Sequence, residues 1–270
     1  MLNIGDIQDY YTENYDISRL KTVADLTKYI YAVDKKTGMS PELFNVDKLL
    51  KINVKINKSM TEPKVLIFHT HGNEMYSDSK DITEGVIGAG NYLTDLLENK
   101  YNVKTLHITR LFDMENGAVN RNGAYERMEP YIAEVLRKNP SVELVIDLHR
   151  DGVNQGIHLV KNIEGKPCAK FMLFNGLCKK WDRGQLVNTE GLSNPYLENN
   201  LALSLKMQLE ADKKYPGITR KIYLNAYRYS LHFKPNSMLI ELGAQTNTKE
   251  EAFNSIEIIA QLINDVVLHS

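Results

Sequence analysis

A run of four apolar residues followed by a polar turn constrains this chain more than any other stretch. Residues 65–68 read Val-Leu-Ile-Phe, and residues 69–74 read His-Thr-His-Gly-Asn-Glu. An uninterrupted apolar run of this length is typical of a strand buried on both faces of an α/β sheet. Gly72 frees the backbone to turn as soon as the strand ends. The stretch therefore predicts a central strand that carries polar side chains at its carboxyl end.

The polar residues of this stretch are of the types that bind zinc. His69 and His71 are two residues apart, and in a strand such residues point to the same side of the sheet. Glu74 follows in the loop. Zn²⁺ takes imidazole and carboxylate ligands at about 2 Å in a tetrahedral arrangement, and open sheets bind ligands beyond the carboxyl ends of their strands. The alternative is that one histidine caps the strand while the other packs inside.

A second apolar run, residues 144–146, ends in Asp-Leu-His-Arg-Asp-Gly at 147–152. Asp147 and His149 alternate onto one face of the strand, so the carboxylate can orient the imidazole or join it at a metal. Charged groups at the end of a buried strand are costly unless they are paired or bind a metal. The alternative is an internal ion-pair cluster in which Arg150 contacts Asp147 or Asp151.

A third apolar run, residues 239–243, contains one carboxylate and reads Leu-Ile-Glu-Leu-Gly. Burial raises the pKa of a carboxyl group toward the range of a general base, which makes Glu241 a candidate for that role. Gly243 ends the strand, so Glu241 is expected near the same sheet edge as His71 and His149. Three such strand ends predict metal-assisted hydrolysis, in which Glu241 takes the proton of a water activated by the ion. The alternative is a structural carboxylate paired with a buried cation.

Strand and helix patterns alternate from residue 64 to the end of the chain. Strands are expected at 65–70, 103–108, 142–148, 169–174, 221–224 and 238–242, and helices at 84–99, 121–138, 196–211 and 249–268. These repeated βα units predict an α/β fold with a twisted, largely parallel sheet and helices on both faces. Residues 61–270 are expected to form the main domain. Residues 1–60 are expected to be a small extension packed on it, with a helix at 16–31 and an edge strand at 49–56.

Composition excludes several classes of function. The chain has 33 basic and 34 acidic residues, a balance that gives no electrostatic reason to bind nucleic acid. Cys168 and Cys178 match neither a disulfide framework nor a zinc-ribbon spacing. No apolar run approaches the roughly 20 residues of a bilayer span, and the first residues do not resemble a signal peptide. These features predict either a cytosolic protein or a soluble piece of a longer one.

The three motifs together resemble a known family. His-Thr-His-Gly-Asn-Glu, Asp-Leu-His-Arg-Asp-Gly and Ile-Glu-Leu-Gly-Ala-Gln-Thr-Asn, in this order, are similar to the stage II sporulation protein P family. That family is related to zinc-dependent N-acetylmuramoyl-L-alanine amidases. The resemblance covers about residues 60–268 and implies an amidase/phosphorylase-hydrolase-like fold with a Zn²⁺ cofactor.

The resemblance also implies roles for particular residues. His71 and His149 match the zinc-binding histidines of the amidases, and Glu241 matches their catalytic base. The zinc-binding glutamate of the amidases lies near the start of the next helix, which would be Glu84 here. We favour Glu74, because its position three residues after His71 allows the two to bind one ion. His69 and Asp147 remain alternative ligands or residues that support the ligands.

The activity implied is cleavage of the amide between N-acetylmuramic acid and L-alanine in peptidoglycan, with cleavage of peptide crosslinks as a further activity. The family acts in engulfment during endospore formation, together with a lytic transglycosylase, stage II sporulation protein D. An N-terminal membrane segment anchors the family's full-length proteins outside the cytoplasm. Because this chain contains no such anchor, we expect a soluble fragment that acts outside the cytoplasm.

Two other functions are compatible with the motifs. A metallocarboxypeptidase or deacylase needs a guanidinium for a terminal carboxylate, and Arg150 and Arg121 are the candidates because arginine offers a bidentate fork. Arg121 opens a predicted helix, where a solvated surface position is the alternative. A non-catalytic cell-wall-binding module would keep the fold and have no use for Glu241.

Overall fold

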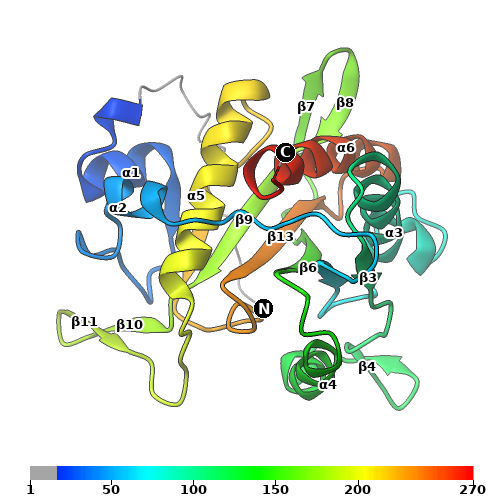
Figure 1. Cartoon of the computed structure of the whole chain (residues 1–270), viewed down its shortest axis with the longest axis horizontal. Helices are drawn as coiled ribbons and strands as arrows, with labels where there is room; N and C mark the ends of the chain where they lie inside the picture. The colour runs from blue at the N-terminus through cyan, green and yellow to red at the C-terminus, as the bar shows by residue number, and fades with distance from the viewer. Residues whose placement is uncertain (1–16, 270) are drawn as a thin grey trace.

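A seven-stranded sheet forms the centre of the molecule in the computed structural model, which describes residues 17–269 (Figure 1). The strand order is β1-β12-β9-β13-β6-β2-β3. In that order the strands are β1 (Tyr31–Val33), β12 (Ile222–Asn225), β9 (Phe171–Gly176), β13 (Asn236–Ala244), β6 (Leu144–Asp151), β2 (Val65–Phe68) and β3 (Thr105–His107). Neighbours in this sheet are parallel except β9 and β13, which are antiparallel. The predicted α/β fold with a largely parallel sheet is confirmed.

The order and direction of the strands bring the three sequence motifs together. Strands β13, β6 and β2 are adjacent and parallel, so their carboxyl ends meet at one edge of the sheet. In the register of these strands, Glu241 lies beside His149, and Phe68 lies beside Asp147. The residue that begins the first motif, His69, directly follows Phe68.

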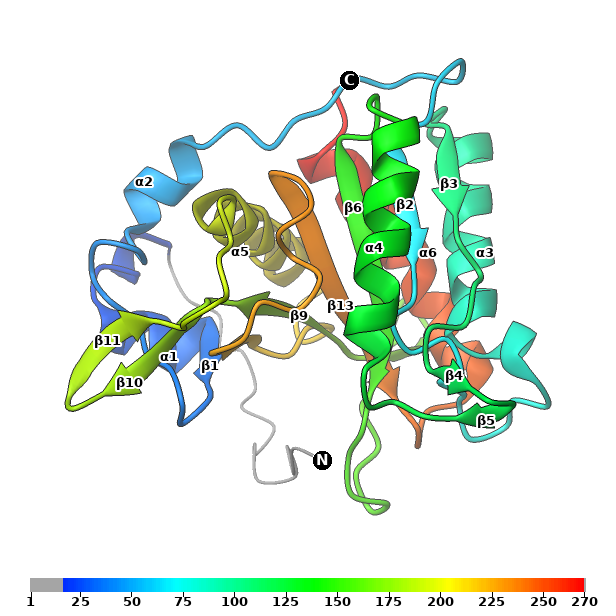
Figure 2. The ribbon, with the colours of Figure 1, turned by 90° about the horizontal axis from the view of Figure 1, so that it is seen from below.

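Helices cover both faces of the sheet (Figure 2). The helices are α3 (Val86–Asp95), which continues as a π-helical turn (Leu96–Lys100), α4 (Ala124–Lys138), α5 (Leu197–Lys214) and α6 (Lys249–Val266). Ile67 and Ile146 share the main hydrophobic core with side chains of α3, α5 and α6. Phe68 and Val145 point to the opposite face, where they pack against Met128 and other residues of α4. The alternating side chains of the central strands therefore fill two separate cores, which explains their continuous apolar sequence.

The amino-terminal part of the described chain joins the same sheet. It contains a short 3₁₀ helix (Ile17–Arg19), α1 (Val23–Tyr29), β1 and α2 (Val46–Lys51). The strand predicted at 49–56 is wrong, because this region begins as α2. Asn45 caps that helix by accepting the amide of Lys48 at 2.9 Å, and the buried Val46 and Leu49 are spaced for a helix. The division of the chain at residue 60 stays a prediction.

Several elements were not expected from the sequence. They are a 3₁₀ helix (Ile82–Glu84) and three hairpins, β4 (Met114–Glu115) with β5 (Ala118–Val119), β7 (Val160–Ile163) with β8 (Lys166–Ala169), and β10 (Lys179–Asp182) with β11 (Gln185–Asn188). Helix α4 contains Pro130 and continues past it to Lys138. Between residues 17 and 269, no helix has the length and apolar character to cross a membrane.

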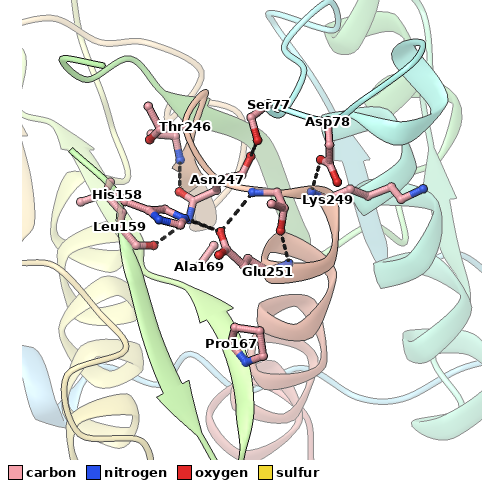
Figure 3. A network of polar contacts seen from close by, with 12 residues as sticks. Ser77, Asp78, His158, Leu159, Pro167, Ala169, Thr246, Asn247, Lys249 and Glu251 are labelled. Atoms are coloured by element: carbon pink, nitrogen blue, oxygen red, sulfur yellow. Dashed lines mark hydrogen bonds and ion pairs between the residues drawn. The ribbon is translucent and has the colours of Figure 1, made fainter. Parts of the chain in front are cut away.

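A polar network fixes the turn that follows Glu241 (Figure 3). Thr248 and Glu251 form the capping box that starts α6, and Glu251 also contacts Nε2 of His158 at 2.8 Å. The side chain of Asn247 donates to Glu251 at 2.8 Å and to the carbonyl of Leu159 at 2.9 Å. Gly243 lies at a φ of +62°, and a Cβ there would meet the Asn247 side chain at 2.7 Å. The end of β13 is therefore held against α6 and the β7–β8 hairpin.

Candidate active site

The predicted site residues converge just beyond the carboxyl end of β2 and in the carboxyl-terminal parts of β6 and β13. The ring centroids of His71 and His149 are 5.3 Å apart. Nδ1 of His149 lies 3.4 Å from Oε2 of Glu74, and Nε2 of His149 lies 2.8 Å from Oδ1 of Asp147. Glu241 is the neighbour of His149 in the β13–β6 register. The structure thus brings together five residues that the sequence places in three separate segments.

Backbone and guanidinium groups hold Glu74 in this cluster. Its Oε2 accepts the backbone amide of Arg150 at 3.0 Å, and its Oε1 lies 3.4 Å from Nη2 of Arg121. Its carbonyl accepts the amide of Val86 at 3.0 Å, which ties it to the start of α3. Burial favours the neutral acid, but His149 and Arg150 outweigh it and hold the pKa of Glu74 below its usual value. The side chain is therefore a buried carboxylate.

His149 lies between two carboxylates. Asp147 is fixed by Thr70, which donates its backbone amide at 2.9 Å and its hydroxyl at 2.7 Å. The contact of Asp147 with Nε2 of His149 is an ion pair without hydrogen-bond alignment. Burial opposes the charged imidazole, but Asp147 and Glu74 raise the pKa of His149 well above its usual value. The site is consequently built to hold positive charge.

Glu241 is a carboxyl group in surroundings that disfavour its charge. Its Oε2 is buried and has no hydrogen-bond partner among residues 17–269. Burial, together with the charges of Asp151 and Glu74, raises the pKa of Glu241 to about 8, although His149 and Arg220 oppose the shift. Arg220 is held by Asp151, 2.6 Å from its Oδ2. A group with this pKa can accept and release a proton near neutral pH.

The raised pKa predicts a pH-dependent stability. In the metal-free folded protein Glu241 loses its proton near pH 8, whereas in the unfolded chain it does so near its ordinary value of 4.5. Stability should therefore fall as pH rises from about 4.5 to about 8, because the unfolded state releases its proton first. Glu241→Gln should remove this loss of stability. At pH 8, in the presence of a chelator, the free energy of unfolding of the variant should exceed that of the parent by about 1–3 kcal/mol, measured by urea unfolding. Equal stability of variant and parent at pH 8 would contradict the raised pKa of Glu241.

His69 does not join this cluster. Its Nδ1 lies 2.7 Å from the carbonyl of Leu148, and its Nε2 lies 2.8 Å from Nε2 of His107. Burial lowers the pKa of His69 to about 4 and that of His107 to about 3, so both rings are neutral at neutral pH. Strand β2 ends at Phe68, so the alternation that was expected to place His69 and His71 together does not reach His71. His69 remains on the α3 side of the sheet and braces β2 against β6.

The second candidate for the carboxylate ligand lies outside the cluster. Glu84 forms an ion pair with Lys249 at 2.8 Å and accepts the amide of Lys80 at 2.8 Å. We therefore expect Glu74→Ala to lower zinc affinity by about 100-fold and Glu84→Ala to leave it within about twofold, because only Glu74 adjoins His149. Titration of the metal-free variants with Zn²⁺ against a chelating dye measures both. Loss of zinc from the Glu84 variant alone would move the ligand to the start of α3.

Two residues of the site were given no role by the sequence. Thr70 fixes the side chain of Asp147. The signal in the sequence that could have identified Thr70 is a hydroxyl residue at the end of one strand, opposite a carboxylate on another strand. Tyr125, in the first turn of α4, lies edge-on to His71, with ring centroids 5.7 Å apart. Arg121 and Arg150 lie beside Glu74, as candidates for substrate binding should.

The side chains gathered here are of the types that bind zinc. In the described part of the chain, no three His, Cys, Asp or Glu side chains are placed to hold a metal ion as they stand. Nδ1 of His71 is nevertheless buried and has no hydrogen-bond partner within residues 17–269. Two histidines and a glutamate are one of the ligand sets of catalytic zinc. The residue types at this edge of the sheet therefore fit Zn²⁺.

Sequence comparison identifies the family. The family model for stage II sporulation protein P matches residues 8–264. The chain belongs to the stage II sporulation protein P family. The stage II sporulation protein P of Bacillus subtilis (strain 168) is 21% identical in an alignment of 218 residues that covers 75% of this chain and 50% of that protein. This member of the family thus spans about half the length of the curated relative that it matches.

Solved structures similar to this stage II sporulation protein P family member include two amidases. N-acetylmuramoyl-L-alanine amidase AmiC2 of Nostoc punctiforme is 15% identical with a TM-score of 0.45, covering 75% of this chain and 96% of that chain. The N-acetylmuramyl-L-alanine amidase Ami1 from Mycobacterium abscessus, in its apo form, is 15% identical with a TM-score of 0.46, covering 76% and 99%.

Proposed function

We propose that this chain is a zinc-dependent peptidoglycan hydrolase that cleaves the amide between N-acetylmuramic acid and L-alanine during endospore formation. The observation that carries the proposal is the position of Glu241, a half-buried glutamate with a raised pKa, beside His149, which in turn adjoins Glu74 and His71. Membership of the stage II sporulation protein P family supports the substrate and the setting. Cleavage of peptide crosslinks is a further activity to test.

The chain's residues divide the work of hydrolysis. When bound by His71, Glu74 and His149, Zn²⁺ supplies a Lewis acid that polarises a carbonyl and lowers the pKa of water. Glu241 accepts a proton from the attacking water on its buried carboxylate and passes it to the leaving amine. Asp147, 2.8 Å from Nε2 of His149, holds the imidazole in place.

Arg121 and Arg150 are proposed to bind the acidic stem peptide. The side chain of Arg121 is 49% exposed, so it can reach a ligand. Arg150 is fixed by its Nε, which donates to the carbonyl of Met75 at 3.0 Å. Both lie on the Glu74 side of the cluster. The full-length protein is proposed to act outside the cytoplasm, with the lytic transglycosylase stage II sporulation protein D as an expected partner.

Digestion of purified peptidoglycan tests this proposal. The chain is incubated with and without a chelator, and the products are read by mass spectrometry. We expect intact stem peptides with free L-alanine amino termini, lost with the chelator and restored by Zn²⁺. Release of single carboxy-terminal residues would instead support a metallocarboxypeptidase. Binding to peptidoglycan without cleavage, with or without Zn²⁺, would support a non-catalytic wall-binding module.

A further inference from the structure

Aromatic side chains continue away from the catalytic cluster across one face of the sheet. Tyr125, which lies edge-on to His71, is also edge-on to Tyr229, with ring centroids 5.5 Å apart. The ring centroids of Tyr229 and Phe174, on β9, are 4.6 Å apart, and those of Phe174 and Tyr223, on β12, are 5.3 Å apart. These rings follow the strand order from the site toward the β1 edge. Figure 2 shows the loop 226–235 between α4 and the β10–β11 hairpin.

The loop that carries Tyr229 is firmly held. Arg228 contacts both oxygens of Glu129 on α4, at 2.7 and 2.6 Å, and His232 lies 3.2 Å from the same carboxylate. A Cβ at Gly176 would meet the carbonyl oxygens of Tyr227 and Arg228, so the loop packs directly on β9. Tyr229 itself has a φ of +54°, a left-handed conformation that is rare for an aromatic residue. Strained backbone of this kind persists where surrounding contacts enforce it, and it is concentrated at functional sites.

Two exposed aromatic residues extend this line. Tyr227 is 45% exposed and Trp181, on β10, is 49% exposed. Lys36 joins them, since its Nζ lies 5.4 Å from the centre of the Tyr227 ring and its carbonyl accepts the amide of Trp181 at 3.0 Å. The indole rests on Gly38, where a Cβ would overlap it. One side of the Trp181 indole therefore packs on the backbone at Gly38, and the other side is open to solvent.

The two sides of the catalytic cluster differ in chemistry. On the side of β2 lie the guanidinium group of Arg121, 3.4 Å from Glu74, and that of Arg150, which donates to the carbonyls of Met75 and Asp151. On the side of β9 lie the aromatic rings, where Arg228 is paired with Glu129 and the ammonium of Lys36 lies over the Tyr227 ring. A muramyl amide joins an acidic peptide to a neutral sugar. The flat, apolar faces of pyranose rings suit aromatic surfaces, and the carboxylates of the peptide suit guanidinium groups.

We infer that Trp181, Tyr227 and Tyr229 form a saccharide-binding track that holds the glycan strand, with the stem peptide directed toward Arg121 and Arg150. The inference rests on the proposed function for the identity of the glycan, and it adds the orientation of the substrate and the residues that bind the sugars. Because the track continues beyond the catalytic cluster, it engages sugars at a distance from the bond that is cut.

The single tryptophan of the chain gives a direct test. A peptide-free oligomer of N-acetylglucosamine is titrated into the metal-loaded protein while tryptophan fluorescence is recorded, and calorimetry measures the same binding. We expect a saturable change in fluorescence. Tyr227→Ala and Trp181→Ala should each weaken binding by about 3- to 10-fold. The matched control is Met60→Ala, which removes a side chain that is 47% exposed at the far end of β2 and should leave binding unchanged.

A kinetic comparison separates this inference from the proposed function. With long glycan strands as substrate, Trp181→Ala should raise KM, and the increase should be larger than with a single disaccharide-peptide, which is too short to reach the track. Trp181→Phe should restore most of the affinity, since it keeps an aromatic face. Absence of saccharide binding by the parent, or equal binding by the parent and both alanine variants, would overturn the track. Saccharide binding without any hydrolysis would overturn the proposed function and leave the track intact.

Discussion

Glu241→Gln is expected to bind zinc as tightly as the parent and to lose about 10²–10⁴-fold in kcat on peptidoglycan. The substitution keeps the size of the side chain and removes its ability to accept a proton. Glu241 is not one of the three residues assigned to the metal, and Oε2 is buried without a hydrogen-bond partner in the described structure, so no protein contact of that oxygen is lost. Zinc content by atomic absorption and product release by mass spectrometry measure the two effects separately.

The matched control for this experiment is Glu251→Gln. Glu251 is also a glutamate, but it serves the start of α6, where Asn247, Thr248 and His158 surround it. Its replacement should lower stability and leave kcat near the parent value. If Glu241→Gln turns over peptidoglycan at the parent rate, another group must accept the proton and the assignment of the base is wrong.

The sequence predicted that these residues lie together because they follow or belong to recognisable strands. Apolar runs end directly before His69, Asp147 and Gly243, and parallel strands from repeated βα units place such ends at one edge. What the sequence could not give was the environment created by distant segments. Glu74 and Glu84 differ little as residues, and only the folded chain shows that Arg150 contacts the first and Lys249 the second.

The features that the sequence did not predict have the same physical origin. His69 was grouped with His71 by strand alternation, but its position depends on contacts with His107 and Leu148, which are 38 and 79 residues further along the chain. The reversal of β9 relative to β13 depends on how the sheet is assembled, and short apolar runs carry no information on direction. The region at 49–56 has the alternating pattern of a strand, but the cap at Asn45 stabilises a helix that includes its first residues.

His149→Ala is expected to lower zinc affinity by about 10²–10³-fold and to abolish hydrolysis at ordinary zinc concentrations, because the binding energy of such a site is shared by few ligands. His149 contacts Glu74 and lies 5.3 Å from the ring of His71, so it is the residue that joins the two halves of the proposed ligand set. Competition with a chelating dye gives the affinity. Since removal of a buried side chain can also unfold the protein, circular dichroism of the variant is recorded alongside.

Two further variants keep this prediction decisive. His149→Gln retains much of the side-chain volume beside Asp147 and should lose zinc in the same way, which separates the loss of a ligand from a packing defect. His158→Ala removes another histidine that contacts a carboxylate, Glu251 at 2.8 Å, but one that is 49% exposed and far from His71 in the network of contacts. It should keep stoichiometric zinc and full activity. If folded His149→Ala and His149→Gln both keep stoichiometric zinc, His149 is not a ligand. The positive charge that Glu74 and Asp147 favour at this position would then be that of the protonated His149 ring alone.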